Sequence, residues 1–242
     1  SDVCSSDLVA LTACSKPQVV RVASKNFTEQ VILGEIIAQH VEHKLGRQVD
    51  RRLNLGGTMI AQQALANGEI DLYPEYTGTA LSEVLKKSSD GGTAEQVRKR
   101  VQTGYLNRFH VEWLAPLGFQ DTFAMVIPGA LARAKHLENL SDAAAVAEPW
   151  SLGVGYEFQH RPDGMAAVDQ TYHLRWKGTP KTMDLGLLYK AMEQGQVNMI
   201  AANSTDGLLT KMDLKALTDD KHAFPPYEVC IAVRQESLAN FI

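Results

Sequence analysis

Short β-branched runs alternate with longer helical patterns in the N-terminal part of the chain. We expect strands at residues 18–24, 49–55 and 70–73, and helices at residues 28–45 and 56–68. This β-α-β-α-β order is typical of a parallel, doubly wound sheet. In such a sheet the carboxyl ends of the strands form the edge at which ligands bind.

A second α/β set follows a predicted helix near residues 94–106. We expect a crossing strand at residues 122–128, further strands at residues 151–158, 197–204 and 228–234, and helices at residues 164–174 and 182–196. The simplest architecture is two α/β lobes that are joined by crossing strands and separated by a cleft. We assign residues 18–121 and 227–242 to lobe 1, and residues 122–226 to lobe 2.

The composition argues against several classes of protein. The 24 Lys and Arg residues against 28 Asp and Glu give a net charge of −4, without the concentrated basic face that nucleic-acid binding needs. No apolar run approaches the roughly 20 residues that span a bilayer. The three cysteines, Cys4, Cys14 and Cys230, lie too far apart for a zinc site or a disulfide framework. We therefore expect no metal, no cofactor and no nucleic-acid partner.

The first 17 residues are left out of the expected fold, because they look like a signal segment and linker. The stretch VALTACSKP ends an apolar run with small residues directly before Cys14, which resembles a bacterial lipobox. In that interpretation Cys14 is the lipidated first residue of the mature protein. The alternative is a truncated signal peptide with a chance cysteine. Residues 1–8, SDVCSSDL, look foreign to either segment.

Two tyrosines, Tyr73 and Tyr76, lie in the unusually polar stretch GEIDLYPEYTGTAL. Within this stretch the turn at residues 73–76 follows a predicted strand, as do the turns at residues 24–26 and 54–58. Because the carboxyl ends of parallel strands meet at one edge of a sheet, we expect the three turns to converge on a ligand-binding rim.

Six motifs occur in an order that resembles a known family, the glycine betaine-, choline- and carnitine-binding proteins of bacterial osmoprotectant ABC importers. The motifs are SKNFTEQVILGEI, NLGGT, ALANGEIDLYPEYTGTAL, LGVGYEFQHRPDG, STDG and DDKHAFPPYE. The resemblance covers about Val20 to Arg234. It implies an α/β type II periplasmic-binding-protein fold, in which each lobe is a doubly wound, mainly parallel sheet and two crossing strands form the hinge. Since such proteins usually continue through further helices, it also implies a C-terminal truncation after RQESLANFI.

The chemistry of a quaternary amine explains which residues such a site needs. A trimethylammonium group donates no hydrogen bond, but aromatic faces attract it by roughly 0.5–2 kcal/mol per ring. A ligand carboxylate needs cationic or hydroxyl donors, and a bidentate arginine is the strongest. The resemblance assigns Tyr76 and Tyr227 to the aromatic cage, Lys25, Thr79 and Arg161 to the carboxylate, and Asp121 to an acid beside the cage. Tyr73 matches no such position and is interpreted as lobe packing.

The sequence departs from the family pattern at two cage positions. Phe123 stands where a third tyrosine is common, and it keeps a π face without the hydroxyl. Asn203 stands before STDG, where another aromatic residue is common, so one ring is replaced by an amide. These departures favour a bulkier betaine, such as carnitine or a histidine betaine, or weak binding.

We therefore expect a monomeric, lipid-anchored solute receptor, not an enzyme, in the periplasm or on the outer face of the bacterial cytoplasmic membrane. It would hold a quaternary-ammonium solute between closing lobes and deliver it to an ABC permease. One alternative is a binding protein for choline or ergothioneine. The other is a two-lobed α/β enzyme, for which the sequence offers no nucleophile–base pair or metal set.

Overall fold

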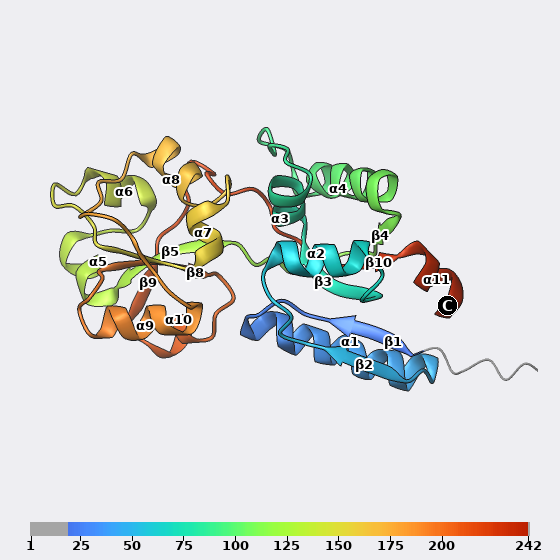
Figure 1. The fold of residues 1–242 in the computed structure, drawn as a ribbon. Helices are drawn as coiled ribbons and strands as arrows, with labels where there is room; N and C mark the ends of the chain where they lie inside the picture. Colours follow the sequence, from blue (N-terminus) through green and yellow to red (C-terminus); the bar gives the residue numbers. More distant parts are fainter. Residues whose placement is uncertain (1–18, 242) are drawn as a thin grey trace, which may run out of the picture.

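A computed structural model of the chain describes residues 19–241, which form two α/β lobes side by side (Figure 1). The predictions for the signal segment and for Cys14 fall outside these residues. Each lobe contains a five-stranded sheet that is covered by helices. Among the described residues, no helix combines the length and the apolar character that crossing a bilayer would require.

The sheet of lobe 1 has the strand order β2-β1-β3-β10-β4. Its strands are β1 (Val20–Ala23), β2 (Val49–Arg52), β3 (Leu72–Tyr76), β4 (Val111–Trp113) and β10 (Val229–Arg234). β1 pairs in parallel with β2 and β3, whereas β10 runs antiparallel to both β3 and β4. One reversed strand therefore lies within an otherwise parallel sheet.

The helices of lobe 1 cover this sheet. They are α1 (Thr28–Leu45), α2 (Thr58–Ala66), α3 (Thr77–Thr79), the π-helical turn η1 (Ala80–Val84), α4 (Ala94–Phe109) and α11 (Gln235–Phe241). α1 packs Ile37 and Val41 into one apolar cluster with Val20 and Val22 of β1. Burying each such side chain contributes roughly 1.5–3 kcal/mol. The helix ends at Gly46, whose φ of 60° suits a residue without a Cβ.

The sheet of lobe 2 has the strand order β7-β6-β8-β5-β9. Its strands are β5 (Phe123–Pro128), β6 (Leu152–Val154), β7 (Lys181–Thr182), β8 (Met199–Asn203) and β9 (Leu214–Ala216). Here β5 is the reversed strand, antiparallel to β8 and β9, while β6 pairs in parallel with β7 and β8. The two lobes therefore repeat the same plan, a mainly parallel sheet with one opposed strand.

The helices of lobe 2 are short. They are α5 (Gly129–Lys135), α6 (Leu140–Ala145), α7 (Tyr156–His160), α8 (Met165–Tyr172), α9 (Leu185–Glu193) and α10 (Leu208–Lys211). The predicted strand over residues 151–158 is too long. The strand β6 ends at Val154, and after Gly155 the chain turns into α7.

Two segments connect the lobes, residues 114–122 and residues 217–228. They run antiparallel to one another, with a bridge between Gln120 and Glu228. The amide of Val229 donates to the carbonyl of Phe119 at 3.2 Å, and the amide of Asp121 donates to the carbonyl of Tyr227 at 3.3 Å. This arrangement confirms the predicted two-lobed α/β fold. The predicted crossing strands are instead two connecting segments that pair around a single bridge, and the strand predicted to cross at residues 122–128 is β5 of the lobe 2 sheet.

Candidate functional site: the cleft between the lobes

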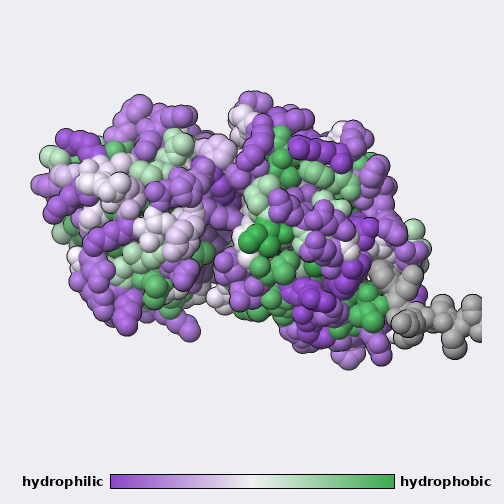
Figure 2. All heavy atoms as spheres, viewed as in Figure 1, coloured by the Kyte–Doolittle hydropathy of each residue, from purple (hydrophilic) through white to green (hydrophobic). Residues whose placement is uncertain are grey.

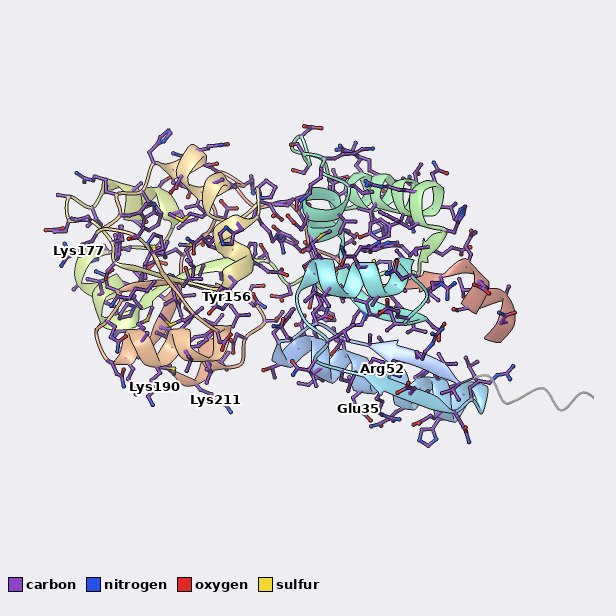
Figure 3. All side chains as sticks on the ribbon, viewed as in Figure 1. Glu35, Arg52, Tyr156, Lys177, Lys190 and Lys211 are labelled. Atoms are coloured by element: carbon purple, nitrogen blue, oxygen red, sulfur yellow. The ribbon has the colours of Figure 1, made fainter. Side chains whose placement is uncertain are left out.

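A cleft with a volume of about 1270 Å³ separates the two lobes. Figure 2 shows the groove from one side, with hydrophobic residues gathered on the rim of lobe 1 over the first turns of α1 and α2. In Figure 3, Tyr156 of α7 lies on the side of lobe 2 that faces lobe 1, whereas Lys177 lies at the far end of lobe 2. All eight residues predicted for the site line the cleft: Lys25, Tyr76, Thr79, Asp121, Phe123, Arg161, Asn203 and Tyr227.

The ends of the strands bring these residues together. Tyr76 is the last residue of β3, Asn203 is the last residue of β8, and Lys25 follows the end of β1. Phe123 begins the reversed strand β5, and it pairs directly opposite Asn203. The cleft therefore lies at the carboxyl ends of the parallel strands, where open α/β sheets place their ligands.

On the lobe 1 side, two stacked rings form part of the wall. Phe27 and Tyr76 lie 6.1 Å apart, centroid to centroid, with an interplanar angle of 24°. The hydroxyl of Tyr76 donates to a carboxylate oxygen of Glu29 at 2.7 Å, which fixes the plane of the ring. Phe27 and Glu29 were not predicted as site residues, although both lie in the SKNFTEQ motif that carries the resemblance.

Phe123, at the start of β5, is the centre of a second aromatic group, which extends from lobe 2 to the second crossing segment. Its ring meets Phe158, Phe224 and Tyr227 edge to face, at 5.0, 5.8 and 6.0 Å between centroids. A Cβ on Gly78 would come within 2.6 Å of the Tyr227 ring, so this glycine allows the ring to lie on the backbone of α3. Tyr76, Phe123 and Tyr227 belong to one contiguous apolar cluster, and sequence reasoning missed Phe158 and Phe224 in it.

Lys25 is buried and is already paired. Its Nζ lies 2.6 Å from a carboxylate oxygen of Glu75, and both side chains are almost inaccessible to solvent. The same Nζ lies 4.7 Å from the centroid of the Tyr76 ring, within cation–π range. The predicted carboxylate-binding lysine thus has an internal counter-ion that the sequence analysis did not identify.

Arg161 has a similar arrangement on lobe 2. Its Nε and Nη2 donate to the two carboxylate oxygens of Asp163, at 2.9 and 2.5 Å, and Nη2 also donates to the hydroxyl of Thr79 at 3.1 Å. The hydroxyl of Tyr227 donates to Asp163 as well, at 2.6 Å. Burial alone would raise the pKa of Asp163, but the hydrogen bonds and charge of Arg161 outweigh it and hold the pKa below its usual range. The arginine therefore links Thr79 of lobe 1 to lobe 2.

Asp121 lies in the first crossing segment with only long hydrogen bonds to its carboxylate. Ser204 Oγ and the Thr205 amide both donate to it at 3.4 Å. Burial, and then the negative charge of Glu29, raise the pKa of Asp121 to about 6. A carboxylate held this way is stabilised by an incoming cation, because a nearby positive charge favours the ionised form.

Tyr73 lies apart from these groups. It is fully buried in the core of lobe 1 with Tyr105 and Trp113, and it is not among the residues that line the cleft. Its hydroxyl donates to Glu75 at 3.1 Å, so it supports the counter-ion of Lys25 from behind. Within residues 19–241, no group of three or more His, Cys, Asp and Glu side chains is arranged to hold a metal ion.

Two α/β lobes around a cleft, joined by paired crossing segments, define a two-lobed solute-binding protein. The chain belongs to the family described as the substrate-binding domain of ABC-type glycine betaine transport systems, whose sequence pattern matches residues 18–241. The family predicted from the six motifs is thereby confirmed. So is the predicted class, a binding protein and not an enzyme.

Three curated relatives show how far the similarity extends. The chain is 34% identical over 228 residues to the ergothioneine transport permease/ergothioneine binding protein EgtU of Helicobacter pylori, covering 93% of this chain and 40% of that protein. It is 31% identical over 237 residues to the carnitine transport binding protein OpuCC of Listeria monocytogenes, covering 94% and 76%. A glycine-betaine-binding protein of Pseudomonas aeruginosa is 32% identical over 235 residues, covering 92% and 73%. The chain thus spans less than half of the Helicobacter protein.

Solved structures have the same fold. A glycine betaine/carnitine/choline ABC transporter structure superposes with a TM-score of 0.74 at 28% identity, covering 91% of this chain and 82% of the other. Apo YehZ of Escherichia coli gives a TM-score of 0.66 at 27% identity, covering 92% and 83%. Both agree with the two-lobed type II fold.

Proposed function

We propose that this protein captures a quaternary-ammonium solute, such as glycine betaine or carnitine, in the cleft between its lobes. The observation that carries this proposal is that Tyr76, Phe123 and Tyr227 line one cleft together with the buried acid Asp121. Aromatic faces and a nearby carboxylate stabilise a permanent cation without needing a hydrogen bond from it.

The size of the cleft indicates that binding involves closure. Small-molecule sites typically enclose about 300–1,000 Å³, and this cleft measures about 1270 Å³. Rotation about the paired crossing segments would narrow the cleft around a ligand, between Phe123 and Phe158 of lobe 2 and Phe27 and Tyr76 of lobe 1. The closed, ligand-bound form would be the one that a permease distinguishes from the empty form.

The proposal also covers the residues that would bind the rest of the ligand. Lys25, Thr79 and Arg161 would approach the carboxylate of a betaine, and Asn203 would replace one ring of the cage. A choline-binding protein is the main alternative, because choline has the same cation without a carboxylate. Cys14 would carry the lipid anchor, and a monomer would deliver the solute to an ABC permease on the extracytoplasmic side of the membrane.

Matched pairs of ligands test the proposal by calorimetry. Glycine betaine is compared with 3,3-dimethylbutanoate, and choline with 3,3-dimethylbutanol. Within each pair the only difference is the central atom of the headgroup, which is a charged nitrogen in one ligand and a neutral carbon in the other. We expect at least one quaternary amine to bind and to raise the melting temperature, and its neutral-headed isostere to bind at least tenfold more weakly. Equal affinities within both pairs, or no binding of any quaternary amine, would contradict the proposal.

Replacing Asp121 by asparagine should have opposite effects on stability and on binding. Because the folded-state pKa of about 6 exceeds the usual value near 3.9, the ionised carboxylate destabilises the empty protein above about pH 6, and this cost disappears as the pH falls below the unfolded-state value. At pH 7.5 we expect the variant to gain on the order of 1–3 kcal/mol in unfolding free energy. It should also bind a quaternary amine about tenfold more weakly, because the attraction to the carboxylate is lost.

Urea unfolding and calorimetry at pH 7.5 and pH 5 check both effects. The wild-type affinity should fall between pH 7.5 and pH 5 as Asp121 takes up a proton, while the affinity of the Asp121→Asn variant should stay nearly constant. A variant that loses stability at pH 7.5 would show that the ionised carboxylate does not destabilise the empty protein. A variant that keeps the wild-type pH dependence of binding would show that this carboxylate does not face the cation.

A further inference from the structure

Glu157 connects the two lobes across the cleft. It belongs to α7 of lobe 2, yet its Oε1 accepts a hydrogen bond from the backbone amide of Thr58 at 2.6 Å, and its Oε2 accepts one from the Thr58 hydroxyl at 3.0 Å. Thr58 is the first residue of α2 in lobe 1. In Figure 3, the neighbouring Tyr156 lies on the side of lobe 2 that faces lobe 1.

The contact is close because lobe 1 leaves room for it. A Cβ on Gly57 would lie 2.5 Å from Glu157 Oε1, so the carboxylate lies directly against the backbone before α2. The start of a helix presents free amides and the positive end of the helix dipole, both of which favour a carboxylate. Glu157 therefore occupies a position in the cleft that suits an anion.

The two cations assigned to a ligand's carboxylate lie beside the same position. Arg161 Nη1 approaches Glu157 Oε2 at 3.4 Å, and Lys25 Nζ approaches the Thr58 hydroxyl at 3.4 Å. Burial would raise the pKa of Glu157, but the charge of Lys25 and the hydrogen bonds from Thr58 outweigh it and lower the pKa. The protein's own carboxylate is thus held ionised by the groups that a betaine would use.

Among the described residues, the cation that pairs with Glu157 is shared with another acid, because Arg161 contacts Glu157 at 3.4 Å and Asp163 at 2.5 Å. Lys25 is paired with Glu75, and Arg161 is paired with Asp163. Glu157 is therefore the third carboxylate placed against two cations. A ligand carboxylate entering this corner would be the fourth, and like charges within a few ångströms repel strongly in a partly buried site.

We propose that Glu157 is a specificity-determining residue that competes with the carboxylate of the ligand for the Thr58, Lys25 and Arg161 corner of the cleft. A betaine has to displace Glu157 from Thr58 before its own carboxylate can bind there. Choline, which has the same headgroup and no carboxylate, leaves Glu157 in place and gains from its negative charge. This inference rests on the proposed function, because it assumes that quaternary amines bind in the cleft.

The test is the ratio of two dissociation constants, glycine betaine against choline, measured by calorimetry on the same protein preparation. In Glu157→Gln and Glu157→Ala, removal of the charge should shift the ratio at least tenfold in favour of glycine betaine. The two variants remove the charge in different ways, and Glu157 is partly exposed, so at least one is expected to fold. Glu193→Gln, which removes an exposed charge at the end of α9, is the matched control and should leave the ratio unchanged.

The outcomes separate this inference from the proposed function. If the variants bind quaternary amines with the wild-type ratio, the role of Glu157 is wrong and the proposed function stands. If Glu193→Gln shifts the ratio as much as Glu157→Gln does, the effect is one of overall charge, and the inference is again overturned. If wild-type protein binds none of the quaternary amines, the proposed function fails, and the inference fails with it.

Discussion

Replacing Arg161 by alanine is expected to lower the free energy of unfolding by about 3–5 kcal/mol, because it would leave a buried carboxylate without its partner. The side chains of Arg161 and Asp163 are only 7% and 6% exposed. Once the guanidinium is gone, Asp163 keeps the Tyr227 hydroxyl as a donor but loses two charge-assisted hydrogen bonds. Urea unfolding at pH 7 measures the loss directly.

The dependence of this loss on pH identifies its cause. In the wild type, Arg161 lowers the pKa of Asp163, so the pair contributes stability above the unfolded-state pKa and loses it as the pH falls through the lower, folded-state value. In the variant, the buried carboxyl can take up a proton and relieve the penalty. The gap between wild type and variant should therefore narrow from pH 7 to pH 4, and a gap that stays constant would point to lost packing instead.

An exposed pair of the same type provides the control. Arg133 and Asp213 form a bidentate ion pair, in which Nη1 and Nη2 each lie 2.7 Å from a carboxylate oxygen. Their side chains are 67% and 62% exposed. Because water solvates both groups, Arg133→Ala should change the unfolding midpoint little. If the two alanine variants were equally stable, burial of the Arg161 pair would not matter for the fold.

The alternation of helices and strands was sufficient to predict the two-lobed fold, since each β-α unit carries its own local pattern. The same pattern also explains the error over residues 151–158. Apolar residues continue at every second position from Leu152 to Phe158, which favours a strand throughout. In the structure Tyr156 begins a helix and is 59% exposed, so its ring does not continue the buried face of the strand.

The acids that pair with Lys25 and Arg161 were not predicted from the sequence. Glu75 and Asp163 lie within the motifs that carried the family resemblance, but a single sequence does not say which cation each of them faces. Glu75 is 50 positions from Lys25, and the two meet only because β1 and β3 lie side by side. Glu157 and Thr58 are 99 positions apart in the sequence and lie in different lobes. Their contact therefore depends on the relative orientation of the two lobes.

The change in the cage with the largest expected effect is Tyr227→Ala. This ring is 2% exposed, lies on Gly78 and meets Phe123 edge to face. Removing it should lower the free energy of unfolding by about 3–5 kcal/mol, as for other buried aromatic residues. It should also weaken binding of a quaternary amine by about 1–3 kcal/mol, which corresponds to roughly 5- to 150-fold in Kd.

Tyr227→Phe separates the ring from the hydroxyl, because phenylalanine keeps the π face and loses only the hydrogen bond to Asp163. We expect this variant to lose about 1–2 kcal/mol in stability while its Kd for a quaternary amine changes less than threefold, since cation–π attraction depends on the ring. Calorimetry on both variants, at a temperature where each is folded, makes the comparison. If the phenylalanine variant binds as weakly as the alanine variant, the network through Asp163 and Arg161 holds the ligand, and the ring contributes only to packing.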